Sequence, residues 1–119
     1  MSEACAGRIE VGVGPELTAF QQNILVILTE ESMYGLAIKR ALEEYYDTDV
    51  NHGRLYPNLD DLVEMGLVEK SELDKRTNQY ELTERGLEVV VERVGWIASK
   101  FAVDDERTSQ LVDAVESAG

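Results

Sequence analysis

The segment from Val50 to Gly86 constrains the fold of this chain more than any other part of it. It begins with apolar side chains at helical spacing, as the buried stripe of a short amphipathic helix requires. These residues are Leu55, Leu59, Leu62 and Val63. Met65-Gly66 follows, which places a glycine where a helix commonly ends. The segment therefore predicts a short helix that closes in a tight turn.

Two strand-like runs come after this turn, with a polar loop between them. In 67–73 and 79–82 apolar residues recur at roughly every second position, which predicts strands with one buried face. The linker 74–78 carries the adjacent cations Lys75 and Arg76, which we expect at the loop tip. A helix, a glycine stop and a hairpin in this order predict a winged helix, whose wing touches phosphate.

Two further helices precede this unit. Thr18 and Gln21 form a Thr-x-x-Gln capping box, so the first helix should begin at Thr18 and bury one stripe. Its stripe consists of Phe20, Ile24, Ile27 and Leu28. Met33-Tyr34 fits a short strand, and Gly35 should open a second helix through about Tyr46. The residues expected to face inward there are Leu36, Ile38, Leu42 and Tyr45.

The third helix is the predicted recognition helix. Asn51 is its natural cap, and Pro57 should make its first turn irregular or 3₁₀-like, because proline lacks the amide hydrogen. Its apolar stripe leaves Arg54, Asn58 and Asp61 on the far side as groove-facing candidates.

The last helix should begin after Thr83 and mediate dimerisation. Its apolar residues alternate by four and three positions, which is heptad spacing, and Val90 and Ile97 widen the stripe. The stripe is wider than one small core can cover, so we expect a second copy to pack against it. The candidate dimerisation residues are Leu87, Val91, Val94, Ile97, Ala98 and Phe101. Gly95 either permits close approach of two backbones or marks a bend, and Trp96 is either an interface anchor or a core residue.

Three motifs in order carry a resemblance to a family: Tyr34-Gly35 opening a helix, Gly53 to Leu59 inside one, and Met65 to Val68 closing it. From about Leu17 to Phe101 the chain resembles the PadR family of transcriptional regulators. The resemblance implies a mainly α fold with a small β-hairpin, namely a winged helix-turn-helix with a long C-terminal dimerisation helix. We expect a flexible arm at 1–14, the winged helix at 15–84, and the dimerisation helix and tail at 85–119. Similar regulators often act as repressors relieved by a small molecule or a stress signal.

The charge balance is unusual for a protein that binds nucleic acid. The formal net charge is -13 and the sequence pI is near 4.3, whereas phosphate binding normally calls for a basic face. Cations nevertheless gather in the predicted DNA-binding segment, and acidic pairs such as Glu30-Glu31 and Asp104-Asp105 lie outside it. This pattern resembles proteins of halophiles, in which dense carboxylates keep a chain hydrated in molar salt. An acidic winged-helix module that binds other proteins and no DNA is the alternative.

The leading hypothesis is a homodimer that binds double-stranded DNA at a pseudo-palindromic promoter site. Arginine suits guanine and asparagine suits adenine in the major groove, which assigns base contacts to Arg54 and Asn58. The family resemblance places Tyr56 at the DNA surface, although its ring could instead pack against the second helix. Wing cations would add affinity with little sequence information. The candidate DNA-binding residues are His52, Arg54, Tyr56, Asn58, Lys75, Arg76, Lys39 and Arg40.

Other classes of function find little support in the sequence. One histidine, one cysteine and no glycine-rich phosphate loop leave nothing on which to build an enzyme or a cofactor site. Carboxylates at the dimer seam could still form a metal site, but no spacing in the sequence points to one. No apolar run approaches the length of a membrane span, so we expect a cytoplasmic protein without a membrane partner. Cys5 stands alone in the N-terminal arm, where a redox role is open.

Overall fold

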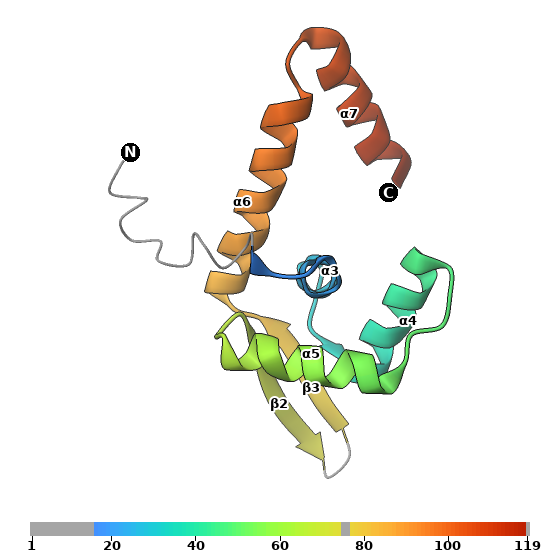
Figure 1. Cartoon of the computed structure of the whole chain (residues 1–119), viewed down its shortest axis with the longest axis vertical. Helices are drawn as coiled ribbons and strands as arrows, with labels where there is room; N and C mark the ends of the chain where they lie inside the picture. The colour runs from blue at the N-terminus through green and yellow to red at the C-terminus, as the bar shows by residue number, and fades with distance from the viewer. Residues whose placement is uncertain (1–15, 75–76, 119) are drawn as a thin grey trace.

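The structure is a computed structural model of the chain, and it describes residues 16–74 and 77–118. The elements alternate as the sequence predicts, with helices around a small antiparallel sheet and two helices at the C-terminal end (Figure 1). In chain order they are α3 Ala19–Leu28, β1 Met33–Tyr34, α4 Gly35–Tyr46, α5 His52–Glu64, β2 Val68–Asp74, β3 Thr77–Leu82, α6 Glu84–Phe101 and α7 Asp105–Ala118. The predicted arm at 1–14 and the cations Lys75 and Arg76 lie outside the described residues.

The N-terminus of α3 is capped as predicted. The Thr18 hydroxyl accepts from the Gln21 amide at 3.1 Å, and the Gln21 side chain accepts from the Thr18 amide at 3.2 Å. This pair satisfies amides that the first turn leaves without partners. The helix crosses the centre of the winged domain, where its buried residues meet those of α4, α5 and β3. Its core residues are Phe20, Ile24, Leu25 and Leu28.

Two of the inward positions predicted for α4 are wrong. Ile38 and Leu42 are fully buried, but Leu36 and Tyr45 are exposed. At about 100° per residue, Leu36 points away from Ile38. Tyr45 lies in line with Ile38, but it belongs to the last turn of α4 and is exposed there. The neighbouring Tyr46 packs against the core and stacks on Phe20 with ring centroids 6.1 Å apart.

The start and the end of α5 follow the local sequence signals. The Asn51 side chain caps the helix by accepting from the Gly53 amide. Despite Pro57, α5 is an α-helix throughout, so the predicted irregular first turn is wrong. One 3₁₀-type bond is present at its start, from the Arg54 amide to the Asn51 carbonyl. At the other end Gly66 takes a left-handed conformation with φ of 80°. The amides of residues 66 and 67 then bond back to the carbonyls of residues 63 and 62, which is a Schellman motif.

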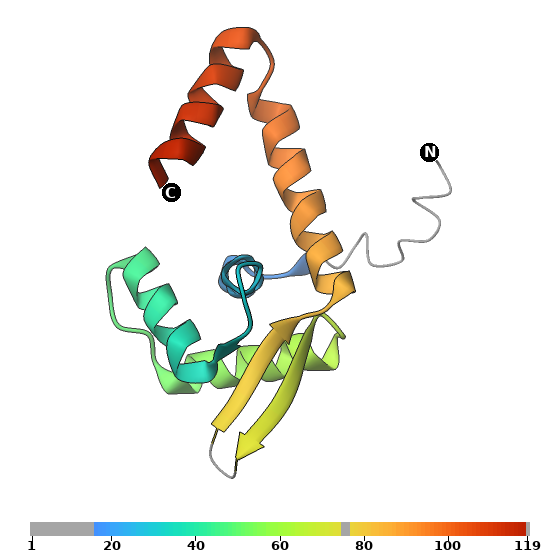
Figure 2. The same cartoon turned by 180° about the vertical axis from the view of Figure 1, so that it is seen from behind.

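The sheet has the strand order β1-β3-β2 with both pairs antiparallel. Met33 lies opposite Tyr80, and Lys70 lies opposite the same tyrosine on the other side. The alternation predicted for β2 is wrong: only Val68 is buried, and the rest of the strand is exposed. This follows because the outer part of the β2–β3 hairpin extends beyond the helices, as a wing does (Figure 2).

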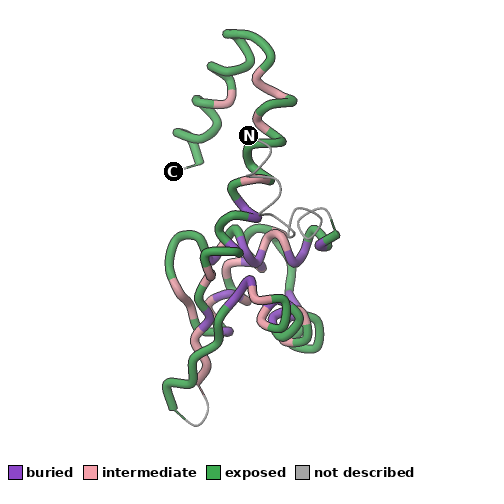
Figure 3. Tube along the Cα trace, turned by 90° about the vertical axis from the view of Figure 1, so that its left-hand side faces the viewer, coloured by how far each residue is buried: buried purple, intermediate pink, exposed green. Residues whose placement is uncertain are grey.

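The C-terminal helices leave the winged domain (Figures 1 and 3). Thr83 joins the two parts, because its hydroxyl accepts from the Gly86 amide at 3.0 Å and donates to the Gly66 carbonyl at 2.7 Å. Val89 and Val90, near the start of α6, are buried in the core of the winged domain. Val90 therefore does not belong to the exposed dimerisation stripe in which the sequence placed it. Beyond these two valines α6 and α7 are mostly exposed (Figure 3).

Candidate nucleic-acid interface

The outward face of α5 is polar, and its only cation is held against α3. Arg54 is exposed, yet its guanidinium carbon lies 3.9 Å from the centroid of the Phe20 ring. This is a cation–π contact. Arg54 therefore occupies the predicted surface, with its charged group over the Phe20 ring.

Asn58 is turned toward α3 in the free chain. Its side-chain oxygen accepts from Gln21 Nε2 at 3.1 Å, and its side-chain nitrogen donates to the Arg54 carbonyl at 2.7 Å. Gln21 is itself buried. The adenine contact assigned to Asn58 remains a prediction, and in this structure one acceptor site and one N–H of its amide are already used.

His52 and Tyr56 lie next to each other on one side of α5. Their rings stack with centroids 5.7 Å apart and an interplanar angle of 8°. Tyr56 is half-buried and packs against the start of α4, where a Cβ on Gly35 would come within 2.6 Å of the Tyr56 hydroxyl oxygen. Gly35 thus opens α4 and also makes room for this ring. The Tyr56 ring therefore packs against α4, the second helix of the sequence prediction, and His52 is exposed beside it.

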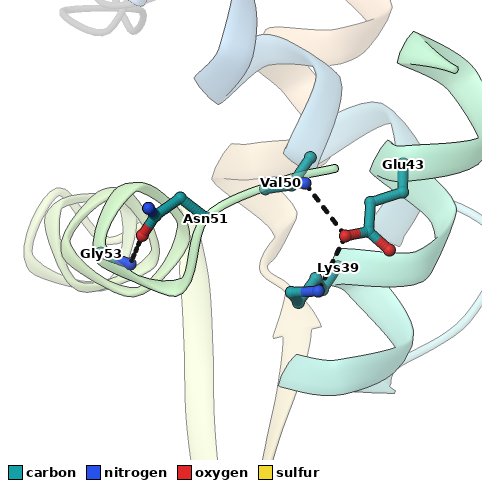
Figure 4. Close-up of polar contacts among 5 residues, drawn as sticks. All are labelled: Lys39, Glu43, Val50, Asn51 and Gly53. Atoms are coloured by element: carbon teal, nitrogen blue, oxygen red, sulfur yellow. Dashed lines mark hydrogen bonds and ion pairs between the residues drawn. The ribbon is translucent and has the colours of Figure 1, made fainter. Parts of the chain in front are cut away.

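Of the two cations expected on α4, only Arg40 is exposed. Lys39 forms an ion pair with Glu43, with 2.7 Å between Lys39 Nζ and Glu43 Oε2 (Figure 4). The same carboxylate oxygen accepts from the Val50 amide at 2.9 Å. These hydrogen bonds, from Lys39 first and then from Val50, hold the pKa of Glu43 below its usual value. A phosphate would have to compete with Glu43 for Lys39, which leaves Arg40 as the better placed of the two.

A cavity of about 590 Å³ lies between the start of α4, Tyr56 and the outer part of the β2–β3 hairpin, where Leu73, Asp74, Thr77 and Asn78 line it. Tyr34 and Tyr80 are among its lining residues, and Tyr80 is almost fully buried. Burial raises the pKa of Tyr80, with smaller contributions from Asp60 and Tyr56. The hydroxyl is therefore a neutral group near neutral pH. The wing cations Lys75 and Arg76 lie outside the described residues, so their contact with phosphate remains a prediction.

Acidic residues occupy the outward side of α5, where the sequence reasoning named only Asp61. Asp60, Asp61 and Glu64 are all exposed, opposite the buried leucines. Lys70 of β2 lies 3.8 Å from Asp60, and both side chains are largely exposed, so this pair contributes little. The helical spacing of the leucines could have shown that Asp60 and Glu64 also lie on the outward side of α5.

The predicted dimerisation stripe is present on α6 as exposed apolar surface. Leu87, Val91, Val94 and Ile97 are each about half exposed or more, whereas Ala98 and Phe101 are half-buried. Trp96 is 56% exposed, and the guanidinium of Arg93 lies 5.3 Å from its ring centroid. In a single chain this Trp96 is no core residue. Gly95 beside it faces open space, because nothing lies within 4 Å of an added Cβ.

Within residues 16–74 and 77–118, no group of three or more histidine, cysteine or acidic side chains could hold a metal ion. Over the same part of the chain, every helix is too short or too polar to cross a bilayer.

The comparisons with known proteins agree with this geometry. The model of the transcriptional regulator PadR-like family matches residues 24–92. The chain belongs to the PadR-like family. A complex structure of RosR from Halobacterium salinarum is 60% identical, covers 88% of this chain and 94% of that chain, and superposes with a TM-score of 0.84. The RosR structure grown from NaBr is 61% identical over 87% of this chain and 94% of that chain, with a TM-score of 0.83.

A PadR-like transcription factor from Bacteroides fragilis shares the fold at 22% identity, covering 84% of this chain and 89% of that chain with a TM-score of 0.59. The comparison with curated proteins gives no match. This PadR-like chain is therefore a transcription regulator of a type found in a haloarchaeon, as its motifs and its acidic composition predicted. The family consists of transcription regulators, which are not typically enzymes.

Proposed function

We propose that this regulator acts as a homodimer that binds a pseudo-palindromic promoter site in double-stranded DNA. The observation that carries the proposal is the position of the apolar stripe on α6. Leu87, Val91, Val94 and Ile97 stay exposed on a helix that leaves the winged domain (Figure 3). Apolar surface of this kind marks a protein interface, and a second copy with the same stripe forms a closed two-fold pair.

In such a dimer each protomer presents α5 to the major groove and the β2–β3 wing to the neighbouring backbone. Two recognition helices then contact half-sites about one DNA turn, roughly 34 Å, apart. Arg54 and Asn58 are proposed to read bases after leaving Phe20 and Gln21, and His52, Tyr56 and Arg40 are proposed to contact the backbone. The wing cations Lys75 and Arg76 add affinity that does not depend on sequence.

We further propose that binding is adapted to high salt. The acidic outward side of α5 and the net charge of -13 support this, as does the 60% identity to RosR of Halobacterium salinarum. Cations taken up between the carboxylates and the phosphates would flatten or reverse the usual loss of affinity with salt.

The regulator is proposed to repress, with relief by a small molecule or a stress signal. Trp96 is the first residue to probe for such an effector, because its exposed ring lies near Arg93 and Lys100 on the dimerisation helix. Quenching of its fluorescence across a metabolite panel is the measurement, and a flat response would argue against an effector at this position.

An acidic module that binds proteins and no DNA is the second candidate. It is favoured by the carboxylates of Asp60, Asp61 and Glu64 on the outward side of α5. It is also favoured by the hydrogen bonds of the Asn58 side chain with Gln21 and the Arg54 carbonyl. Such a surface suits a basic protein partner as well as it suits cation-bridged DNA.

A gel shift with fragments of the protein's own promoter in molar KCl separates the two candidates. The proposal expects a discrete shift that an unrelated duplex does not compete away, and footprinting should then show an inverted repeat. Light scattering in the same buffer should give the mass of two chains. A single-chain mass together with no preference for any genomic duplex would favour the interaction module.

A further inference from the structure

A single carboxylate joins the end of α4 to the start of α5. Glu43 Oε2 accepts from Lys39 Nζ at 2.7 Å and from the Val50 amide at 2.9 Å (Figure 4). Val50 is buried and immediately precedes Asn51, the residue that caps α5 by accepting from the Gly53 amide. The Glu43 side chain on α4 is thus connected to the cap of α5 through the consecutive residues Val50 and Asn51.

The turn between the helices gives this contact its importance. Asp47, Thr48 and Asp49 are exposed, and Asp47 has the left-handed φ of 58°. The amides of Asp47 and Thr48 both bond to the backbone carbonyl of Glu43, at 2.7 and 3.3 Å. Glu43 therefore ends α4 with its backbone and holds the start of α5 with its side chain. Without this acceptor the buried Val50 amide would lose its partner, which a folded protein avoids by moving the segment.

We infer that Glu43 is a positioning residue for DNA recognition, because it sets the pose in which α5 meets the bases. The inference rests on the proposed function, in which α5 enters the major groove. Recognition groups must be held to within about 0.5 Å to act, whereas phosphate contacts position a protein without reading the sequence. Loss of the contact should therefore reduce the preference for the correct site much more than the affinity for DNA in general.

The reach of the carboxylate oxygen matters here, and its charge does not. Glu43→Gln keeps an acceptor oxygen at the same distance along the side chain and removes the charge. Glu43→Asp keeps the charge and withdraws the oxygen by one methylene group. A matched control is Glu44→Ala, which removes the same charge from the neighbouring exposed position.

The experiment measures dissociation constants for the full chain with a site duplex and a scrambled duplex in one KCl buffer. The ratio of the two constants should fall about tenfold, which corresponds to roughly 1.4 kcal/mol, in Glu43→Ala and Glu43→Asp. It should stay near the wild-type value in Glu43→Gln and Glu44→Ala. Hydrogen exchange without DNA gives a second readout, and the amides of Val50, Gly53 and Arg54 should exchange faster in the first two variants only.

Each outcome has a defined meaning. A wild-type ratio in Glu43→Ala, or a loss in Glu43→Gln with none in Glu43→Asp, overturns the inference. If Glu43→Ala does not fold, the comparison of Gln with Asp still decides between reach and charge. Should the wild-type protein prefer no duplex, the proposed function fails, and hydrogen exchange alone then decides whether Glu43 fixes the start of α5.

Discussion

Replacing Arg54 by alanine tests whether α5 reads DNA through this residue. In the free chain the guanidinium carbon lies 3.9 Å from the Phe20 ring centroid, a contact that stabilises an exposed arginine by about 0.5–1 kcal/mol. A bidentate contact with guanine contributes about 1–3 kcal/mol. Because the first contact must break before the second forms, Arg54→Ala should cost about 1 kcal/mol of binding, or roughly fivefold in affinity.

The assay is competition anisotropy in molar KCl with duplexes that each carry one substituted base pair. Arg54→Ala should abolish discrimination at one position of each half-site and leave the other positions unchanged. Arg40→Ala is the control, because this exposed cation should weaken binding to all duplexes alike. Equal weakening across every duplex in Arg54→Ala would refute the assignment of Arg54 as the reading residue.

The stacking contact gives a second check on the same reasoning. Phe20→Leu removes the aromatic face and keeps an apolar side chain in the core position. The freed Arg54 should then bind the matched site up to about fivefold more tightly, even though the fold is less stable. Unchanged discrimination in Phe20→Leu would mean that the cation–π contact does not compete with DNA.

Four further predictions concern packing and charge. Gly86→Ala should lower the free energy of unfolding by about 1–3 kcal/mol, because its Cβ would meet a backbone carbonyl. Gly95 faces open space, so Gly95→Ala should raise the free energy of unfolding by about 1 kcal/mol. Urea titration measures the effect of both substitutions. A lower free energy of unfolding in Gly95→Ala would instead indicate that a second copy packs against Gly95. The lowered pKa of Glu43 adds stability that is present above about pH 4.5 and lost as the pH falls through the lowered value, so acid unfolding should affect wild type more than Glu43→Gln. Asp61→Asn should raise DNA affinity more at ~0.15 M than at ~1 M KCl. Asp113→Asn, at an exposed position of α7, is the control. An equal gain in affinity at both salt concentrations would contradict this prediction.

The boundaries of the elements could be predicted because the signals are local. Thr18 with Gln21, Asn51 and Thr83 each cap a helix where the sequence placed the start. Gly66 ends α5 with a positive φ that other residues rarely adopt. Each signal acts on amides or carbonyls within about one turn, so the neighbouring sequence contains all the information that it needs.

Which side chains are buried depends on elements distant in the sequence, and here the prediction failed. Leu36 points away from Ile38 in the first turn of α4, and Tyr45 lies in its last turn, so neither meets the core and both are exposed. Leu73 is exposed for a similar reason, since the outer part of β2 belongs to the wing. An alternating pattern shows which residues share a face, and the tertiary arrangement decides whether that face meets a core.

The same limit applies to the candidate site. Asn58 bonds with Gln21, which is 37 residues away, and no spacing rule connects the two. The stacking of Arg54 on Phe20 was equally out of reach. The ion pair of Lys39 with Glu43 differs, because a separation of four residues on a helix is a known signal for pairing. The sequence could therefore have shown that Lys39 was a weaker candidate than Arg40.

In the proposed complex with DNA, the acidic outward side of α5 changes how the affinity depends on salt. A carboxylate on α5 repels phosphate over about 10 Å in ~0.1 M salt but over only about 3 Å in 1 M salt. Conventional DNA binders gain affinity by releasing one counterion for each phosphate that a lysine or arginine neutralises, and they lose that gain as salt rises. On α4 and α5 Lys39 is paired with Glu43 and Arg54 is stacked on Phe20, so this surface offers few free cations for such exchange. A protein that derives little of its affinity from counterion release has little of it to lose in concentrated salt, and its acidic residues then cost it binding mainly in dilute buffer.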